Sequence, residues 1–226
     1  MILPPNDVDE LRAVWRAAYL EEDREDLGPG WRMEAGGGPL TRLYVSGMIG
    51  GYRMDAGTFV QAVHALQVDT IHLHVNSPGG FVWDAVSMYE ALRSHPATVI
   101  SHIDGVAASA ASLVALAGDQ VEIARAGRVM IHDAETVAYG SPAQVRRAAE
   151  LVDAISDDMA ALYAERAGGK PATWRAAMSA TTWYSSAQAV ASGLAHRVAG
   201  ETTDSGPDNR TRLIQARQRA LTTQGG

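Results

Sequence analysis

Residues 97–118 read ATVISHIDGVAASAASLVALAG, with a stretch of very small side chains between two apolar runs. The first run, at 97–104, predicts a β-strand, and the second, at 111–118, predicts a short helix. Gly, Ala and Ser dominate between them, although Ala and Gly bury little apolar area at about 25 cal/mol per Å². Packing alone would favour Leu, Ile and Val here. The small residues therefore indicate that space is left there for the backbone of a bound chain.

The alternation of strand and helix continues on both sides of this stretch. The other predicted elements are strands at residues 41–49, 70–76, 120–124 and 128–132, and helices at 55–66 and 82–94. A repeated strand, helix, strand order implies parallel strands joined by right-handed crossovers. The sequence therefore predicts an α/β fold.

A long helix follows from Ser141, which can serve as its N-cap, with Pro142 as the first helical residue. The helix is predicted to span about 25 residues, and its apolar stripe runs from Val145 to Leu162 at steps of three and four. Such a helix is long for a single small sheet, and its length also suits packing against another subunit. Ser185 and Gln188 form a capping box for a last short helix.

The two ends of the chain differ from its middle. Residues 1–39 combine a charged amphipathic helix at 8–26 with a Gly- and Pro-rich segment that is typical of a flexible linker. Residues 201–226 are polar and predict a mobile tail. We therefore expect one compact domain over residues 40–200.

Composition excludes several classes of function. The chain has 226 residues and a formal net charge of -7, which argues against nucleic-acid binding. It has no cysteine, so disulfides, a thiolate nucleophile and a Cys-based zinc site are excluded. No run approaches the roughly 18 apolar residues of a membrane span, and the start lacks the pattern of a signal peptide. We expect a cytoplasmic protein without membrane, metal or cofactor.

The segment NSPGG at 76–80 ends a predicted parallel strand and opens a helix. Its glycines, Gly79 and Gly80, leave backbone N–H groups accessible at the carboxyl edge of the sheet. Open α/β folds bind ligands at this edge. Its spacing matches neither the dinucleotide nor the P-loop motif. A tight turn and an oxyanion hole are both open interpretations.

Ser109 lies between the strand at 97–104 and the helix at 111–118. Its hydroxyl would meet the positive end of the helix dipole among small neighbours, which suits a nucleophile. A plain N-cap serine is the simpler alternative. Ser112 lies one turn further on and is expected to pack or to bond to the preceding turn.

A serine nucleophile requires a base, and histidine is the usual one near neutral pH. His132 ends the apolar run RVMI at the rim of the predicted sheet, where it can reach a helix start on the same rim. His72 and His74 alternate along a strand and most simply form its less apolar face. Their spacing reveals no third metal ligand.

Four segments taken together, NSPGG (76–80), DGVAASAAS (104–112), RVMIHDA (128–134) and WYSSAQAVASGL (183–194), resemble the Clp-type serine peptidase family. The likeness covers about residues 41–199 and is closest to the phage head maturation proteases. It implies a ClpP- and crotonase-like β-α-β spiral whose long handle helix helps to build ring-shaped homo-oligomers.

The same resemblance assigns roles to single residues. It implies that Ser109 is the nucleophile, that His132 is the general base, and that the N–H groups of Gly80 and Ala110 form the oxyanion hole.

The chain departs from the family at the third catalytic position. An Asp or Glu stands there in the family, whereas this chain has Thr181. Loss of the acid costs about 10⁴ in kcat in a trypsin-like triad. Three alternatives are open: a Ser–His dyad oriented by Thr181 or water, a substitute acid such as Asp133 or Glu135, and a site too weak to matter.

The leading expectation is a serine endopeptidase that acts on peptides or unfolded chains, in phage capsid maturation or together with an ATPase. Because no nucleotide-binding loop is found, an AAA+ unfoldase would be a separate chain. The alternatives are an assembly protein that keeps the fold but has lost efficient catalysis and, third, a crotonase-like acyl-CoA enzyme. The last needs no serine nucleophile, and the sequence shows no suitable Glu pair for it.

Overall fold

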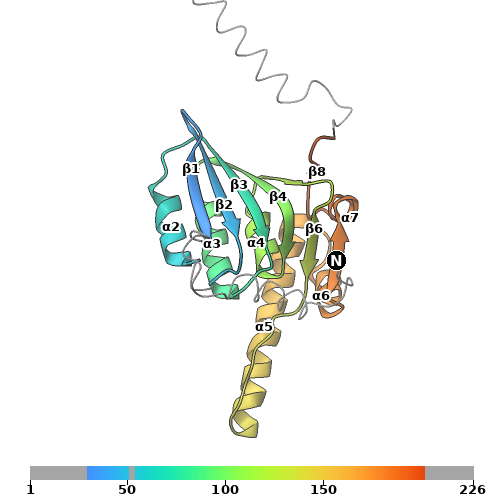
Figure 1. The fold of residues 1–226 in the computed structure, drawn as a ribbon. Coiled ribbons are helices and arrows are strands. Elements are labelled where there is room, and N and C mark those ends of the chain that lie inside the picture. The colour runs from blue at the N-terminus through green and yellow to red at the C-terminus, as the bar shows by residue number, and fades with distance from the viewer. Residues whose placement is uncertain (1–29, 51–53, 202–226) are drawn as a thin grey trace, which may run out of the picture.

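The computed structural model describes residues 30–50 and 54–201 and shows a mixed α/β fold (Figure 1). The strands are β1 (Trp31–Ala35), β2 (Leu40–Ser46), β3 (Thr70–Ser77), β4 (Thr98–Ala108), β5 (Gln120–Ile123), β6 (Arg128–Ile131), β7 (Thr182–Ser185) and β8 (Arg197–Val198). The helices are α2 (Ala56–Ala65), α3 (Val82–Ser94), α4 (Ala110–Leu116), α5 (Pro142–Ala167), α6 (Pro171–Ser179) and α7 (Ser186–Ala191). The predicted α/β fold class is confirmed.

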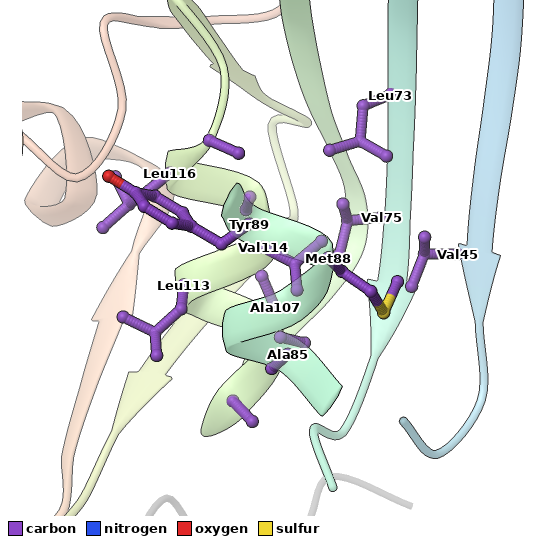
Figure 2. Packing of buried hydrophobic residues seen from close by; sticks show 14 of the residues in the cluster. Val45, Leu73, Val75, Ala85, Met88, Tyr89, Ala107, Leu113, Val114 and Leu116 are labelled. Atoms are coloured by element: carbon purple, nitrogen blue, oxygen red, sulfur yellow. The ribbon is translucent and has the colours of Figure 1, made fainter. Parts of the chain in front are cut away.

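One sheet organises the domain, with strand order β1-β2-β3-β4-β5-β8 and with β6 pairing to both β4 and β7. Strands β2 to β5 are parallel, as the strand, helix, strand order predicts. Val45 of β2 and Leu73 and Val75 of β3 are fully buried, and Met88 of α3 and Val114 of α4 belong to the same core (Figure 2). Alternate residues of each strand thus bury one face of the sheet under the helices.

Strand β4 is longer than the sequence indicates. It was expected to end at 104 and instead continues through the small residues to Ala108. The small side chains explain the extension, because Ala107 and Ala108 are fully buried and pair with Val129 and Met130 of β6. Strand β6 thus occupies part of the space that the small residues were expected to leave for a bound chain.

The region before residue 40 differs from its prediction as a flexible linker. Residues 31–35 form β1, which pairs antiparallel with β2 from Trp31↔Val45 to Ala35↔Thr41. Gly37 and Gly38, with φ of 76° and 72°, make the turn between these strands, so the glycines mark a hairpin. The predicted helix at 8–26 and most of the predicted tail at 201–226 lie outside the described residues.

Helix α5 projects well beyond the sheet (Figure 1). Ser141 and Gln144 form a capping box at its start, and Pro142 is its first residue. Only its C-terminal half enters the core, through residues such as Met159 and Tyr163, whereas Val145 stays 41% exposed. The predicted apolar stripe therefore covers the core over half of its length, and we call the N-terminal half, residues 142–154, the handle.

Candidate active site

Ser109 occupies the sharp turn between β4 and α4. Its backbone has φ 54° and ψ -131°, a region that non-glycine residues adopt rarely and mostly where function maintains strain. Its N–H donates to the carbonyl oxygen of Met130 at 2.8 Å, which ties the turn to β6. Strand and helix thus hold this serine at the rim of the sheet, as the sequence predicts.

His132 follows directly after β6, and its Nε2 lies 2.6 Å from Oγ of Ser109. The pairing of β6 with the end of β4, from Val106↔Arg128 to Ala108↔Met130, explains the contact, because both strands end at the same rim. The imidazole is 4% exposed. The structure therefore brings together the predicted serine and histidine in a geometry that suits proton transfer.

Glu135 supplies the contact on the other side of the imidazole. Its Oε1 lies 3.1 Å from Nδ1 of His132. Asp133 is the other substitute acid considered from the sequence. Its carboxylate accepts from Arg175 Nε at 2.9 Å and from Ser179 Oγ at 2.7 Å. A carboxylate at Nδ1 fixes the tautomer in which Nε2 carries no proton and accepts the proton of the serine.

Thr181, which the resemblance assigns to the acid position, has a left-handed backbone with φ 49°. Its N–H donates to the carbonyl oxygen of Met178 at 2.8 Å, which closes the turn between α6 and β7. Because Ile131 pairs with Thr182 in the β6–β7 ladder, Thr181 stands where the next partner of His132 would be. The position is therefore next to the histidine, although the carboxylate at Nδ1 comes from Glu135.

The NSPGG segment packs against Ser109 with its backbone. A Cβ atom added at Gly79, whose φ is 97°, would lie 2.6 Å from the Ala108 carbonyl oxygen and 2.7 Å from Cβ of Ser109. Gly80 forms a parallel bridge with Ile49. The Ile49 N–H donates to the Gly79 carbonyl oxygen at 2.8 Å, and the Phe81 N–H donates to the Ile49 carbonyl oxygen at 3.0 Å. In a parallel bridge the N–H of the bridging residue itself points away from its partner, so the Gly80 N–H is directed to the other side.

Ala110 is the first residue of α4, so its N–H has no acceptor one turn earlier in that helix. Ser112 has a structural role, as expected: its Oγ donates to the Ser109 carbonyl at 2.5 Å and lies 2.7 Å from the hydroxyl of Tyr163. Tyr163 is fully buried, and burial raises the pKa of its hydroxyl, which therefore stays neutral. This buried pair supports the first turn of α4.

The strand histidines line the polar face of the sheet, as predicted. His72 Nδ1 lies 2.8 Å from His102 Nε2, and the rings of His74 and His102 stack at 4.6 Å. Within residues 30–50 and 54–201, no group of three or more His, Cys, Asp or Glu side chains is placed to hold a metal ion. Over the same ranges, no helix has the length and apolar character needed to cross a membrane.

Comparison with known proteins identifies the family to which the chain belongs. The Clp protease family model matches residues 54–202, a range that includes NSPGG, Ser109, His132 and Thr181. The chain belongs to the Clp protease family. The mixed α/β fold is consistent with this membership, and the family resemblance predicted from the four motifs is confirmed.

Several relatives named as Clp protease subunits are similar to part of the chain. An ATP-dependent Clp protease proteolytic subunit from Pleurastrum terricola is 31% identical over 132 residues, which cover 57% of this chain and 67% of that protein. The subunit of the same name from Huperzia lucidula is 34% identical over 143 residues, 61% of this chain and 67% of its own length. Proteolytic subunit 3 from Streptomyces coelicolor is 28% identical over 140 residues, with coverages of 61% and 64%.

From the sequence, Glu135 is one of two substitute acids, beside Asp133, and a substitute acid is only one of three open alternatives for this site. No helix or strand surrounds Glu135, since the residues after β6 are irregular up to the start of α5. Periodicity therefore carries no information about its direction. The sequence indicates only that Glu135 lies three residues after His132. In the structure the chain turns between them, and this turn brings the two side chains into contact.

Proposed function

We propose that this chain is a serine endopeptidase whose nucleophile is Ser109 and whose general base is His132. The observation that carries the proposal is the 2.6 Å contact between Ser109 Oγ and His132 Nε2 at a strained strand-to-helix turn. In this mechanism Oγ attacks the peptide carbonyl while Nε2 accepts its proton. His132 then returns the proton to the leaving amine, and water hydrolyses the acyl-enzyme by the same route.

The oxyanion hole of this mechanism consists of the N–H groups of Gly80 and Ala110, with Gly79 allowing the loop to approach Ser109. Both donors are backbone groups on segments that contact Ser109, so they are fixed before the substrate binds. Donors of this kind contribute about 10²-fold to 10³-fold each to kcat. Their backbone origin explains why the loop requires glycine and small residues.

In this proposal Glu135 orients His132 and stabilises the imidazolium, the role that an acid at position 181 has in the family. The contact of Glu135 with Nδ1 supports catalysis over the alternative of a non-catalytic assembly protein, whose motivation was the missing acid at Thr181. Thr181 then contributes the turn that leads into β7.

The proposal is tested with a serine-directed fluorophosphonate. Wild-type protein is expected to form a covalent adduct, because His132 activates the Ser109 hydroxyl. The Ser109→Ala variant is expected to form none, and intact-protein mass spectrometry measures both. Equal labelling of the two proteins would refute the assignment of Ser109.

We further propose that the substrates are peptides or unfolded chains. The working form is a homo-oligomeric ring, in which each subunit contributes its compact domain, residues 40–200. The handle supports this, because Leu151 is 58% exposed and Tyr139, in the segment before the handle, is 91% exposed. Val137 and Val145 are exposed as well, and four large apolar side chains exposed between residues 137 and 151 fit an interface better than a surface in water. Sedimentation of the full chain is expected to give a multimer, and a mass of one chain would contradict the ring.

Two biological settings fit this activity: maturation of a phage capsid, which rests on the motif resemblance, and proteolysis fed by a separate AAA+ unfoldase. The relatives named ATP-dependent Clp protease proteolytic subunit support the second setting. Degradation of a stably folded protein by this chain alone, without ATP, would contradict a need for an unfoldase.

A further inference from the structure

One arginine joins the segment after His132 to both of the following helices. Arg175 of α6 lies 2.9 Å from Asp133 through Nε, 2.6 Å from Asp157 through one terminal nitrogen and 2.6 Å from Asp153 through the other. Asp133 also accepts from Ser179 Oγ at 2.7 Å. We call these five residues the Arg175 cluster.

Each of the three residues after His132 has a defined contact. Asp133 is held by Arg175 and Ser179 of α6, and the Ala134 N–H donates to Ser156 Oγ of α5 at 2.8 Å. Ser156 is 1% exposed and itself donates to the Val152 carbonyl, so this anchor is part of the core. Glu135 comes next and turns back to His132 Nδ1. Two anchors thus precede the residue that contacts the imidazole.

We propose that Arg175 is a positioning residue for the candidate active site: by holding Asp133, it fixes residues 133–135 so that Glu135 reaches Nδ1 of His132. The inference rests on the proposed function, because it assigns Arg175 a purpose in orienting the general base. Arg175 lies 43 positions after His132 in the sequence, and no motif of the chain points to it.

The charges of the cluster explain why the arginine has a large influence. Three carboxylates share one guanidinium, so without Arg175 the Asp133 carboxylate would face Asp153 and Asp157 with no cation between them. Asp153 and Asp157 are 68% and 67% exposed and can turn into solvent, whereas Asp133 is 32% exposed and adjoins His132. Asp153 and Asp157 would therefore relieve the repulsion by turning away, whereas Asp133 would keep only its bond with Ser179, and the 133–135 segment would lose one of its fixed contacts.

The geometry also requires an arginine. Its planar guanidinium meets three carboxylates in different directions, which a lysine ammonium on a flexible stem cannot reproduce. The hydrogen bond with Asp133 raises the pKa of Arg175, so its charge persists over the whole pH range of the protein. Lysine is expected to restore the charge of the cluster but only part of the positioning.

The test is a double-mutant cycle between Arg175→Met and Glu135→Gln, read as the rate of fluorophosphonate labelling of Ser109. We expect Arg175→Met to slow labelling about 10-fold in the wild-type background and less than about 2-fold in the Glu135→Gln background. Arg175→Lys should give an intermediate rate. The control is Arg93→Met, which removes another arginine–carboxylate pair, with Asp119 at 2.9 Å, and should leave the rate unchanged.

Equal losses in the two backgrounds, or no loss in either, would overturn the proposal, because Arg175 would then act independently of Glu135. A second readout separates this failure from failure of the proposed function. The proton on His132 Nδ1 gives a downfield NMR resonance when a carboxylate holds it, whether or not the protein cleaves peptides. Loss of this resonance in Arg175→Met and its retention in Arg93→Met supports the positioning role even in an inactive protein, and its retention in Arg175→Met refutes it.

Discussion

Ser109→Ala is expected to lower kcat for peptide hydrolysis by about 10⁵-fold to 10⁶-fold, the loss seen when a serine protease loses its nucleophile. The hydroxyl forms the covalent bond to the substrate, and no other group of the site can replace it. The residual rate would come from the Gly80 and Ala110 N–H groups and from substrate binding. The fold should persist, because Ser109 is tied to β6 by its backbone N–H. A fluorogenic peptide measures kcat, and circular dichroism measures thermal unfolding.

Ser112→Ala is the matched control, since it removes a buried hydroxyl three residues further on, in the first turn of α4. It leaves the Tyr163 hydroxyl without its partner and should reduce the free energy of unfolding by about 1–3 kcal/mol. Its kcat should stay close to that of wild type while the protein is folded. A Ser109→Ala protein that cleaves peptides as fast as Ser112→Ala would exclude Ser109 as the nucleophile.

The fold follows from local patterns to a large extent. Alternating apolar residues predict a strand at 70–76, and β3 spans Thr70–Ser77. Helical spacing predicts a helix at 82–94, and α3 has these bounds. These elements form where the sequence indicates because burial of one face and local backbone preference agree. The long helix follows in the same way from its capping residues, Ser141 and Pro142.

The strands that were missed, β1 and β7, form because a neighbouring strand pairs with them. Strand β1 is short and largely exposed, and it exists because its backbone pairs with β2. Strand β7 has four half-buried residues and is fixed by β6. In such segments the hydrophobic pattern is weak and the register is set by the neighbouring strand. The sequence therefore predicts a linker at β1 and no element at β7.

The residues of the candidate site also differ in how far the sequence predicts them. Ser109 and His132 end regular elements, so topology alone brings their backbones to the same rim. Glu135 and Arg175 meet the site through side chains, one from an irregular segment and one from a helix that the sequence reading missed. Only the folded structure distinguishes Asp133, bonded to Arg175, from Glu135, two residues later, at the imidazole.

Glu135→Gln is expected to lower kcat by about 10²-fold. Replacement of the acid in a trypsin-like triad costs about 10⁴, because the uncharged amide no longer stabilises the imidazolium or fixes the tautomer. The loss should be smaller here because the Glu135 side chain is 54% exposed and solvent screens its charge. KM should change little, since Glu135 contacts the base. Steady-state kinetics with a fluorogenic peptide separates the two parameters, and a kcat within about 2-fold of wild type would show that the dyad functions without an acid.

Thr181→Asp in the Glu135→Gln background should recover part of the lost kcat, because Thr181 stands opposite His132 at the end of the β6–β7 ladder. Aspartate also tolerates the left-handed backbone at φ 49° better than β-branched threonine does. Thr181→Asn is the matched control: it offers the same backbone tolerance without the charge and should give no recovery. In the wild-type background Thr181→Asp should add little, since Glu135 already supplies a carboxylate at Nδ1. A large gain there would mean that the imidazole lacks an effective acid, and that the chain is an impaired peptidase with its defect at position 181.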